Sequence, residues 1–210
     1  MKLLLVGSTG LVGSHVLHLA LAEQRVQEVL VLTRRALNIQ HPKLRTQIVD
    51  FENLPEDARL WHADAVICTL GTTMRIAGSK AAFRRVDYAY PLAVAKRARQ
   101  HHTPAYVLNS ALGANPTARI FYNQVKGELE RDLTQLGYPS LSLIRPGLIG
   151  GAREQVRLGE QTLSVVLNIL SPLLPRRWHI NPAPRIAQAL IEAALEQPQG
   201  TNIVTAEQLI

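Results

Sequence analysis

The sequence predicts an α/β fold in which a parallel β-sheet carries helices on both faces. Two observations predict it. Strand-like apolar runs alternate with helical patterns along the chain, and a glycine-rich turn separates the first run from the first helical pattern. Such alternation is typical of parallel strands joined by crossover helices. Right-handed crossovers then build a doubly wound, Rossmann-like sheet, with a ligand site expected at the carboxyl ends of the strands.

The elements are expected in a regular order. Short runs dominated by aliphatic residues have the length and composition of buried strands. These runs are Leu3–Val6, Glu28–Leu32, Gln47–Val49, Ala65–Leu70, Ala105–Asn109 and Leu141–Ile144. Most are separated by helical patterns at Ser14–Ala22, Ala81–Gln100 and Phe121–Leu136. Beyond Gly150 prolines become frequent, and the pattern predicts a final helix at Ile186–Gln197 and a last short strand at Asn202–Val204.

A glycine-rich turn follows the first predicted strand. Gly7, Gly10 and Gly13 are spaced three residues apart, just before the first helical pattern. Glycines let the backbone approach a pyrophosphate closely, and the N-terminus of the following helix presents free N–H groups to it. A tight strand–helix turn without a ligand is the alternative. The turn predicts a nucleotide-binding loop formed by Gly7, Ser8, Thr9, Gly10, Leu11, Val12 and Gly13.

A tyrosine, a lysine and a serine form the second motif. Tyr122 and Lys126 are four residues apart, so on a helix they share one face. A free phenol titrates near pH ~10, and a neighbouring ammonium group favours its ionised form. Ser110 lies upstream and offers a hydroxyl that can hold a substrate oxygen. This set suits hydride transfer to or from a carbonyl when a nicotinamide lies alongside; an ordinary exposed helix that carries a tyrosine and a lysine is the alternative.

The candidate residues also fall at one end of the predicted strands. Because the carboxyl ends of parallel strands meet at one edge of a sheet, residues that follow the strands are expected to gather there. In chain order these are Gly7, Arg34, Asp50, Leu70-Gly71, Ser110 and Arg145-Pro146-Gly147.

The combined motifs resemble a known superfamily. The glycine turn, Ser110, Tyr122-x-x-x-Lys126 and Arg145-Pro146-Gly147 are together similar to the short-chain dehydrogenases/reductases of the extended or atypical branch. The stretches 49–54, 68–73, 83–87 and 122–130 resemble the Tat-interacting oxidoreductase-like subgroup, and the likeness runs from residue 1 to about residue 195. One departure is Asp87, where many members have an asparagine, so a proton relay through this position is not implied.

The resemblance implies roles for individual residues. Ser110 and Tyr122 would hold a substrate carbonyl oxygen, Tyr122 would supply the proton, and Lys126 would bind the nicotinamide ribose. Asp50 is expected near the adenine amine and Phe51 beside the adenine ring, unless Asp50 caps or pairs locally instead. Further cofactor contacts are expected from Leu70, Gly71, Thr72, Pro146 and Gly147, with Arg145 as a structural residue.

The end of the second predicted strand bears on cofactor choice. An NAD-preferring fold usually has an acidic residue there that accepts a hydrogen bond from the ribose 2′-hydroxyl. This chain has Arg34 and Arg35 instead. A guanidinium group binds a 2′-phosphate through paired hydrogen bonds, whereas a carboxylate would repel it. We therefore expect NADP(H) to be preferred over NAD(H), with Arg34 as the main ligand and Arg35 assisting; two solvated surface arginines are the alternative.

Size and composition agree with one domain. A chain of 210 residues with 47% apolar residues is long enough for one α/β core and short for two domains. Residues 1–150 are expected to form the cofactor-binding core, and residues 151–210 a small substrate-pocket region with the final helix. The lone Cys68 excludes an internal disulfide and is expected in the core. Since the first apolar run ends at Gly7, we expect a cytoplasmic protein without a signal peptide or membrane span.

The net charge of +7 raises nucleic acid as a possible partner. Much of the excess lies between Arg75 and Arg99, but no known nucleic-acid-binding module is present, so a solvated helix face is expected.

His179 either lines the substrate pocket or has a structural role. We expect an NADP(H)-dependent oxidoreductase acting on a carbonyl or alcohol. The alternative is an NADP(H)-binding sensor or scaffold that acts through a protein partner; the substrate and the oligomeric state are left open.

Overall fold

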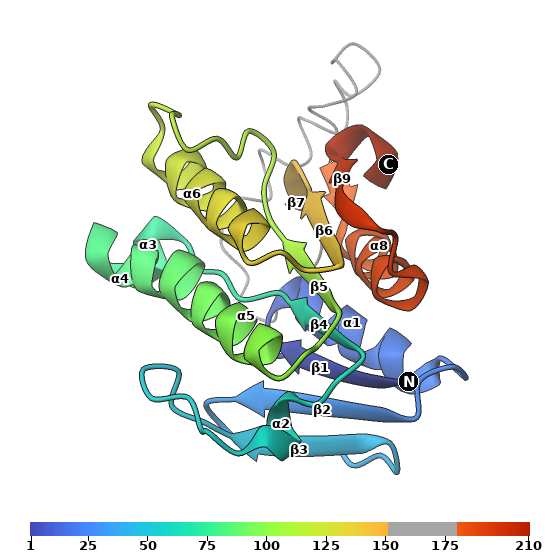
Figure 1. The fold of residues 1–210 in the computed structure, drawn as a ribbon. Coiled ribbons are helices and arrows are strands. Elements are labelled where there is room, and N and C mark those ends of the chain that lie inside the picture. The colour runs from blue at the N-terminus through green and yellow to red at the C-terminus, as the bar shows by residue number, and fades with distance from the viewer. Residues whose placement is uncertain (151–179) are drawn as a thin grey trace.

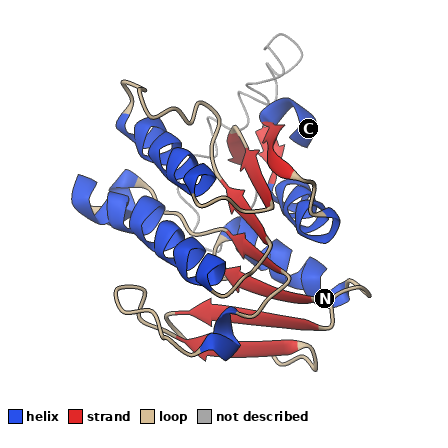
Figure 2. Ribbon diagram, in the orientation of Figure 1, coloured by secondary structure: helices blue, strands red, loops and turns tan. Residues whose placement is uncertain are grey.

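A computed structural model describes residues 1–150 and 180–210, and it has the expected α/β architecture (Figures 1 and 2). Its main sheet has seven strands, all parallel, in the order β3-β2-β1-β4-β5-β6-β9. The strands are β1 (Lys2–Val6), β2 (Glu28–Thr33), β3 (Leu44–Ile48), β4 (Ala65–Cys68), β5 (Ala105–Asn109), β6 (Ser140–Arg145) and β9 (Gly200–Thr205). A separate parallel pair consists of β7 (Leu148–Gly150) and β8 (Ile180–Pro182).

Helices cover both faces of the main sheet (Figure 2). Helices α1 (Leu11–Ala22) and α8 (Ala183–Glu196) pack together on one face. The opposite face carries α5 (Tyr90–Gln100) and α6 (Phe121–Gln135). The short helices are α2 (Ala58–Trp61), α3 (Met74–Ala77) and α4 (Lys80–Arg84), and a 3-10 turn spans Ala206–Leu209.

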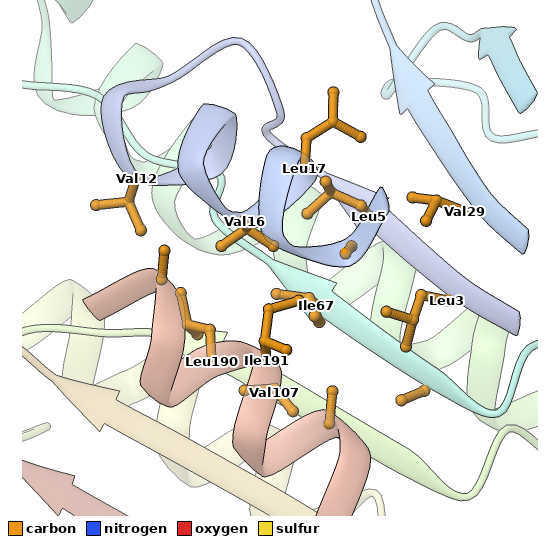
Figure 3. Close-up of a cluster of buried hydrophobic side chains, with 14 of the residues drawn as sticks. Leu3, Leu5, Val12, Val16, Leu17, Val29, Ile67, Val107, Leu190 and Ile191 are labelled. Atoms are coloured by element: carbon orange, nitrogen blue, oxygen red, sulfur yellow. The ribbon is translucent and has the colours of Figure 1, made fainter. Parts of the chain in front are cut away.

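Alternation along each central strand creates two cores. In β1, Leu3 and Leu5 face α1 and α8, whereas Leu4 and Val6 face the opposite helical layer. Figure 3 shows the first of these cores, in which Val16 of α1 and residues of α8 meet over the central strands. Strands buried on both faces read as continuous apolar runs, which is why the central strands were predictable.

The edge strand β3 begins earlier than expected. It starts at Leu44 rather than Gln47 and ends at Ile48. Among the described strands it pairs only with β2, and four of its five residues are exposed, including Arg45 and Thr46. An edge strand lacks the apolar pattern from which the other strands were predicted.

The long predicted helix 81–100 is interrupted. A π-helical turn, Arg85–Ala89, separates α4 from α5. Pro91 stands at the start of α5 and has no N–H group, and its ring would clash with the carbonyl of Asp87 in a regular helix. The wider turn relieves this clash. It also places Asp87 in the protein interior, with 1% of its surface exposed.

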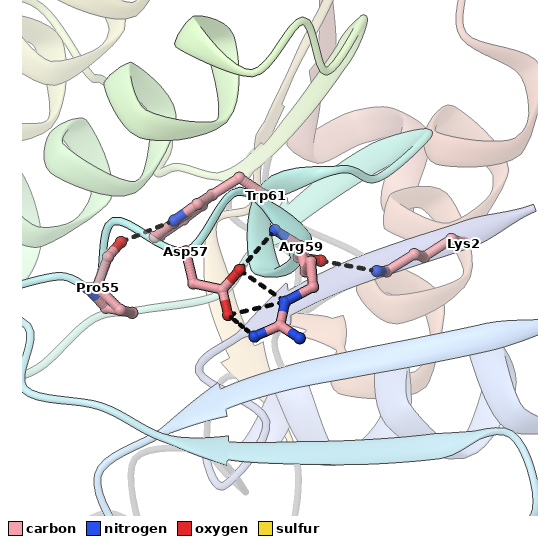
Figure 4. A network of polar contacts seen from close by, with 5 residues as sticks. All are labelled: Lys2, Pro55, Asp57, Arg59 and Trp61. Carbon is pink, nitrogen blue, oxygen red and sulfur yellow. Dashed lines mark hydrogen bonds and ion pairs between the residues drawn. The ribbon is translucent and has the colours of Figure 1, made fainter.

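A polar network holds the connection between β3 and β4 (Figure 4). Asp57 caps α2 by accepting from the backbone N–H of Arg59 at 3.0 Å, and it also accepts from the Arg59 side chain. These hydrogen bonds, the side-chain contacts first, lower the pKa of Asp57 to about 2. The fully buried Trp61 donates to the carbonyl of Pro55, and the Lys2 side chain donates to the carbonyl of Arg59.

The described C-terminal residues belong to the same layered body. Strand β9 extends the sheet beside β6, and α8 buries Ile186 and Leu190 against the face that α1 covers. Within residues 1–150 and 180–210, no helix is long and apolar enough to cross a bilayer.

Candidate active site

The glycine turn forms a tight cradle at the carboxyl end of β1. Gly7 has a φ of +89°, and an added Cβ there would lie 2.6 Å from the carbonyl carbon of Thr69. A Cβ on Gly13 would lie 2.1 Å from the carbonyl oxygen of Gly7. Gly10 caps α1, and its Cβ would meet only that same oxygen, at 3.4 Å. Glycine is therefore required twice for packing, and at Gly10 it leaves the helix N-terminus accessible.

The cradle has the features of an anion site. The first N–H groups of a helix lack intrahelical partners, and the helix dipole favours negative charge there. Helix α1 begins at Leu11, directly after the exposed Thr9 and Gly10. The Ser8 hydroxyl is buried and has no hydrogen-bond partner within the described residues. The cradle thus fits a pyrophosphate, with N–H donors at its rim and an unpaired hydroxyl within it.

The loop after β4 connects this cradle with the predicted catalytic lysine. Gly7 packs against Thr69 and Leu70. A Cβ on Gly71 would lie 3.4 Å from Asp87 Oδ1 and 3.9 Å from Lys126 Nζ. The glycine turn, the β4 loop and Lys126 therefore adjoin one another at the carboxyl edge of the sheet.

Lys126 is held by a buried carboxylate. Its Nζ lies 2.8 Å from Asp87 Oδ1, and the two side chains are 3% and 1% exposed. Burial on its own lowers the pKa of Lys126, but the Asp87 charge, followed by Tyr122, outweighs burial and raises the pKa above its ordinary value. Lys126 therefore remains an ammonium group at neutral pH. Asp87, the departure noted in the sequence, is thus in direct contact with Lys126.

Tyr122 lies on the same side of α6, one turn before Lys126. Its side chain reaches the surface, with 36% of the residue exposed, and its ring centroid is 5.7 Å from that of Phe83. The charge of Tyr122 is also among the influences that raise the pKa of Lys126. An exposed tyrosine and a buried lysine thus stand one turn apart on α6.

Ser110 is directed toward a group that the sequence analysis did not single out. Its hydroxyl donates to Glu130, a buried residue of α6. Arg145 at the end of β6 holds the same carboxylate, donating through Nε at 3.0 Å and also through its terminal nitrogen. Glu130 follows Lys126 by four residues, so helical periodicity predicts that it lies on the same face of the helix as Tyr122 and Lys126. Arg145, expected only as a structural residue, fixes the carboxylate of Glu130.

The residues expected around the adenosine end of the cofactor differ in exposure and in their contacts. Arg34 and Arg35 follow β2 and are exposed. Asp50 accepts hydrogen bonds from the Glu52 backbone and the Asn53 side chain, both at 2.9 Å, so it makes the local cap that was the alternative to an adenine contact. The backbone bond, then that of Asn53, lowers the pKa of Asp50. Phe51 is buried, with its ring centroid 5.5 Å from that of Tyr90.

The Pro146-Gly147 segment is fixed through its backbone. The carbonyl of Pro146 accepts from the N–H of Leu112 at 2.7 Å. The N–H of Gly147 donates to Asn181 Oδ1 at 2.7 Å, and Asn181 Nδ2 donates to the carbonyl of Ala206. Asn181 is fully buried and was missed, since a lone asparagine after a proline-rich segment carries no sequence signal. His179 lies outside the described residues.

Three arginines of the basic segment form ion pairs. Arg84 pairs with Glu128, Arg85 with Glu52, and Arg97 with Glu56. Arg75 and Lys80 are exposed, and Lys80 lies over the ring of Phe121. The segment therefore combines arginines in ion pairs with exposed cations.

A parallel sheet, a glycine cradle and an adjoining tyrosine–lysine pair define a Rossmann-type NAD(P)-binding protein. The model of the NAD-dependent epimerase/dehydratase family matches residues 3–120, and the chain belongs to that family. A relative from Coccidioides immitis, "Protein FMP52, mitochondrial", is 30% identical over 94% of this chain and 87% of its own length. The likeness to the Tat-interacting subgroup stays a prediction.

Solved structures share the fold. The Bordetella bronchiseptica enzyme WbmH, in complex with NAD+, superposes with a TM-score of 0.70 at 17% identity, over 98% of this chain and 75% of that one. The oxidoreductase ylbE from Lactococcus lactis gives a TM-score of 0.69 at 18% identity and covers all of this chain and 95% of its own. At such low identity these similarities concern the fold.

The expectation of a cytoplasmic protein is wrong according to the relatives. The Coccidioides protein and other fungal relatives of the same name are designated mitochondrial. A single buried cysteine does not distinguish among compartments in which thiols stay reduced.

Proposed function

We propose that the protein is an NADP(H)-dependent oxidoreductase that interconverts a carbonyl and an alcohol on a small molecule. The observation that carries this proposal is the position of Gly71, in the loop that packs on the glycine cradle. A Cβ added to Gly71 would lie 3.9 Å from Lys126 Nζ, so the cradle and the lysine border the same edge of the sheet. A nucleotide bound along this edge would bring its reactive end beside the lysine and tyrosine.

The cofactor would be held along the carboxyl edge of the sheet. The glycine cradle would bind the pyrophosphate, and Arg34, with Arg35 assisting, would bind the 2′-phosphate. The backbone near Gly71 and Thr72 and the fixed Pro146-Gly147 segment would border the nicotinamide. Phe51 would limit the adenine end through its packing with Tyr90, whereas the local cap made by Asp50 leaves that side chain a turn-forming role.

When bound, NADPH supplies the hydride for such a reaction. Tyr122 would donate its proton to the substrate oxygen, and Lys126 would bind the ribose and favour the ionised form of Tyr122. Ser110 would hold the substrate oxygen. The proton of the Ser110 hydroxyl is directed at Glu130. To bind a carbonyl, this hydroxyl must rotate, or share its proton between Glu130 and the carbonyl oxygen.

The cofactor assignment is tested by fluorescence titration of the full chain with NADPH and with NADH. We expect tight NADPH binding and much poorer NADH binding. Arg34→Ala should weaken NADPH about 10- to 100-fold, because a charge-assisted bidentate contact is lost, and leave NADH nearly unchanged. Equal losses for both nucleotides would rule out a role in reading the 2′-phosphate. Arg45→Ala, an exposed arginine of β3, is the matched control.

The catalytic role of Tyr122 is tested with Tyr122→Phe in a screen of aldehydes, ketones and alcohols. We expect turnover to fall by about 100-fold or more, the range for loss of a general acid, with NADPH affinity nearly intact. Loss of NADPH binding together with turnover would make the tyrosine a structural residue.

The second candidate is an NADP(H)-binding sensor or scaffold that acts through a protein partner. The contact from Ser110 to Glu130 favours it, since that hydroxyl proton is engaged inside the protein. NADPH binding by the wild-type protein, without turnover of any carbonyl or alcohol in the screen, would support this candidate. Detectable turnover abolished by Tyr122→Phe would eliminate it.

A further inference from the structure

Asp87 is a buried charge with two partners on different elements. Its Oδ1 lies 2.8 Å from Lys126 Nζ on α6, and its Oδ2 accepts from the backbone N–H of Thr72 at 2.7 Å. Thr72 belongs to the loop after β4, next to Gly71. The π-helical turn carries Asp87 into the space between this loop and α6. None of the proposed catalytic steps uses this carboxylate.

The geometry suits an acid at this position better than its amide. A carboxylate has two acceptor oxygens, and here each one receives a different donor. The amide of asparagine has one acceptor and one NH2 group, so it would direct a donor at either Thr72 N–H or the Lys126 ammonium. A buried ammonium also needs a counter-charge, which asparagine cannot provide.

We propose that Asp87 is a positioning residue that holds the Lys126 ammonium and the Thr72 backbone together, and so joins the loop beside the cofactor to the helix that carries Tyr122 and Lys126. This inference rests on the proposed function, in which Lys126 and the β4 loop contact NADP(H). Asp87 acts on the cofactor through these two groups and does not touch it.

The charge of Asp87 sets the protonation of Lys126. The groups that affect Lys126 are Asp87 on the π-helical turn, Tyr122 on the same helix and Cys68 on β4. Burial lowers the pKa of Lys126, and the Asp87 carboxylate is the main influence that reverses this shift. With Asp87→Asn, burial remains while the counter-charge is lost, so the pKa of Lys126 should fall below its ordinary value.

The sign of the pH dependence follows. In the wild type, the pKa of Lys126 is higher in the folded than in the unfolded state, so its contribution to stability is present below about pH 10 and is lost only as the pH rises further. In Asp87→Asn the folded-state pKa is the lower one. Folding then opposes protonation, so the variant is least stable at low pH and gains stability as the pH rises.

The experiment measures urea unfolding and NADPH binding of the full chain at several values from about pH 6 to pH 9.5, for the wild type and Asp87→Asn. We expect the stability deficit of the variant to shrink as the pH rises. We expect its NADPH dissociation constant, relative to the wild type, to increase about tenfold over the same range, as the neutral lysine binds the ribose less well. A purely structural defect would give a constant deficit.

Two variants complete the design. Glu128→Gln removes another carboxylate of α6, paired with Arg84, and should leave both pH profiles parallel to the wild type. Asp87→Asn combined with Lys126→Gln removes the uncompensated charge. The double variant should therefore fold even if Asp87→Asn alone fails to fold, and its stability relative to the wild type should not depend on pH in the way expected for Asp87→Asn. A deficit of Asp87→Asn that is constant with pH, with unchanged NADPH affinity, overturns the inference. Failure of the wild type to bind NADPH overturns the proposed function, while the unfolding profiles still decide whether Asp87 sets the charge of Lys126.

Discussion

At the scale of single residues, the site depends on where a few protons are directed. The Ser110 hydroxyl has one proton, and it is donated to Glu130. A hydroxyl that donates inward presents only lone pairs to a pocket, so it can accept from a substrate hydroxyl but cannot donate to a carbonyl. Glu130 therefore controls which hydrogen bond Ser110 offers. Arg145 keeps this carboxylate in place with its own donors.

Glu130→Gln tests this dependence. The amide leaves one acceptor oxygen for the three donors from Ser110 and Arg145, so the free energy of unfolding should fall by about 1–3 kcal/mol. Urea unfolding measures the change. Glu128→Gln is the control, because its partner Arg84 has a side chain 44% exposed and such a pair contributes about 1 kcal/mol or less. Equal losses in the two variants would contradict a special role for Glu130.

At the scale of elements, the turn between β1 and α1 is built for close approach. Gly7 combines a left-handed conformation with direct packing on the β4 loop, and Gly13 packs on Gly7. The same two elements, β1 and β4, are neighbours in the sheet, so any displacement of the turn would reach the loop beside Lys126. The glycine cradle and the loop beside Lys126 therefore pack against each other at adjacent strand ends.

Gly7→Ala and Gly137→Ala separate packing from backbone strain. Both glycines have positive φ, +89° and +63°, but a Cβ on Gly137 would meet nothing within 4 Å. Gly137→Ala should cost about 1–2 kcal/mol from the left-handed conformation alone. Gly7→Ala should cost about 1–3 kcal/mol more, because of overpacking, and should also weaken NADPH binding. Thermal unfolding and NADPH titration measure both; similar losses would show that Thr69 and Leu70 yield easily.

At the scale of the whole molecule, two hydrophobic cores pack on the two faces of one sheet. The first core combines α1 from the beginning of the chain with α8 from its end, over strands from the middle. Strand β9 closes one edge of the sheet beside β6. Residues 180–210 thus support the same sheet whose carboxyl edge carries the candidate site.

Leu190→Ala tests whether this C-terminal helix is part of the main cooperative unit. Leu190 is fully buried, so its truncation should lower the free energy of unfolding by about 2–5 kcal/mol. Ile203→Ala on β9, where the side chain is 45% exposed, is the control and should cost about 1 kcal/mol or less. A single unfolding transition is expected in both. A separate early transition in Leu190→Ala would indicate that α8 unfolds on its own.

The sequence by itself determined the parallel α/β fold, the glycine cradle and the placement of Tyr122 and Lys126 on one helix face. These features are local, since they follow from strand periodicity, glycine spacing and the i,i+4 geometry of helices. The tertiary structure alone decided which residues contact Ser110 and Lys126. Asp87 and Glu130 meet Lys126 and Ser110 across elements that are distant in sequence, and the π-helical turn before Pro91 carries Asp87 into the interior. Contacts between separate elements have no fixed spacing along the chain, so no sequence pattern could specify them.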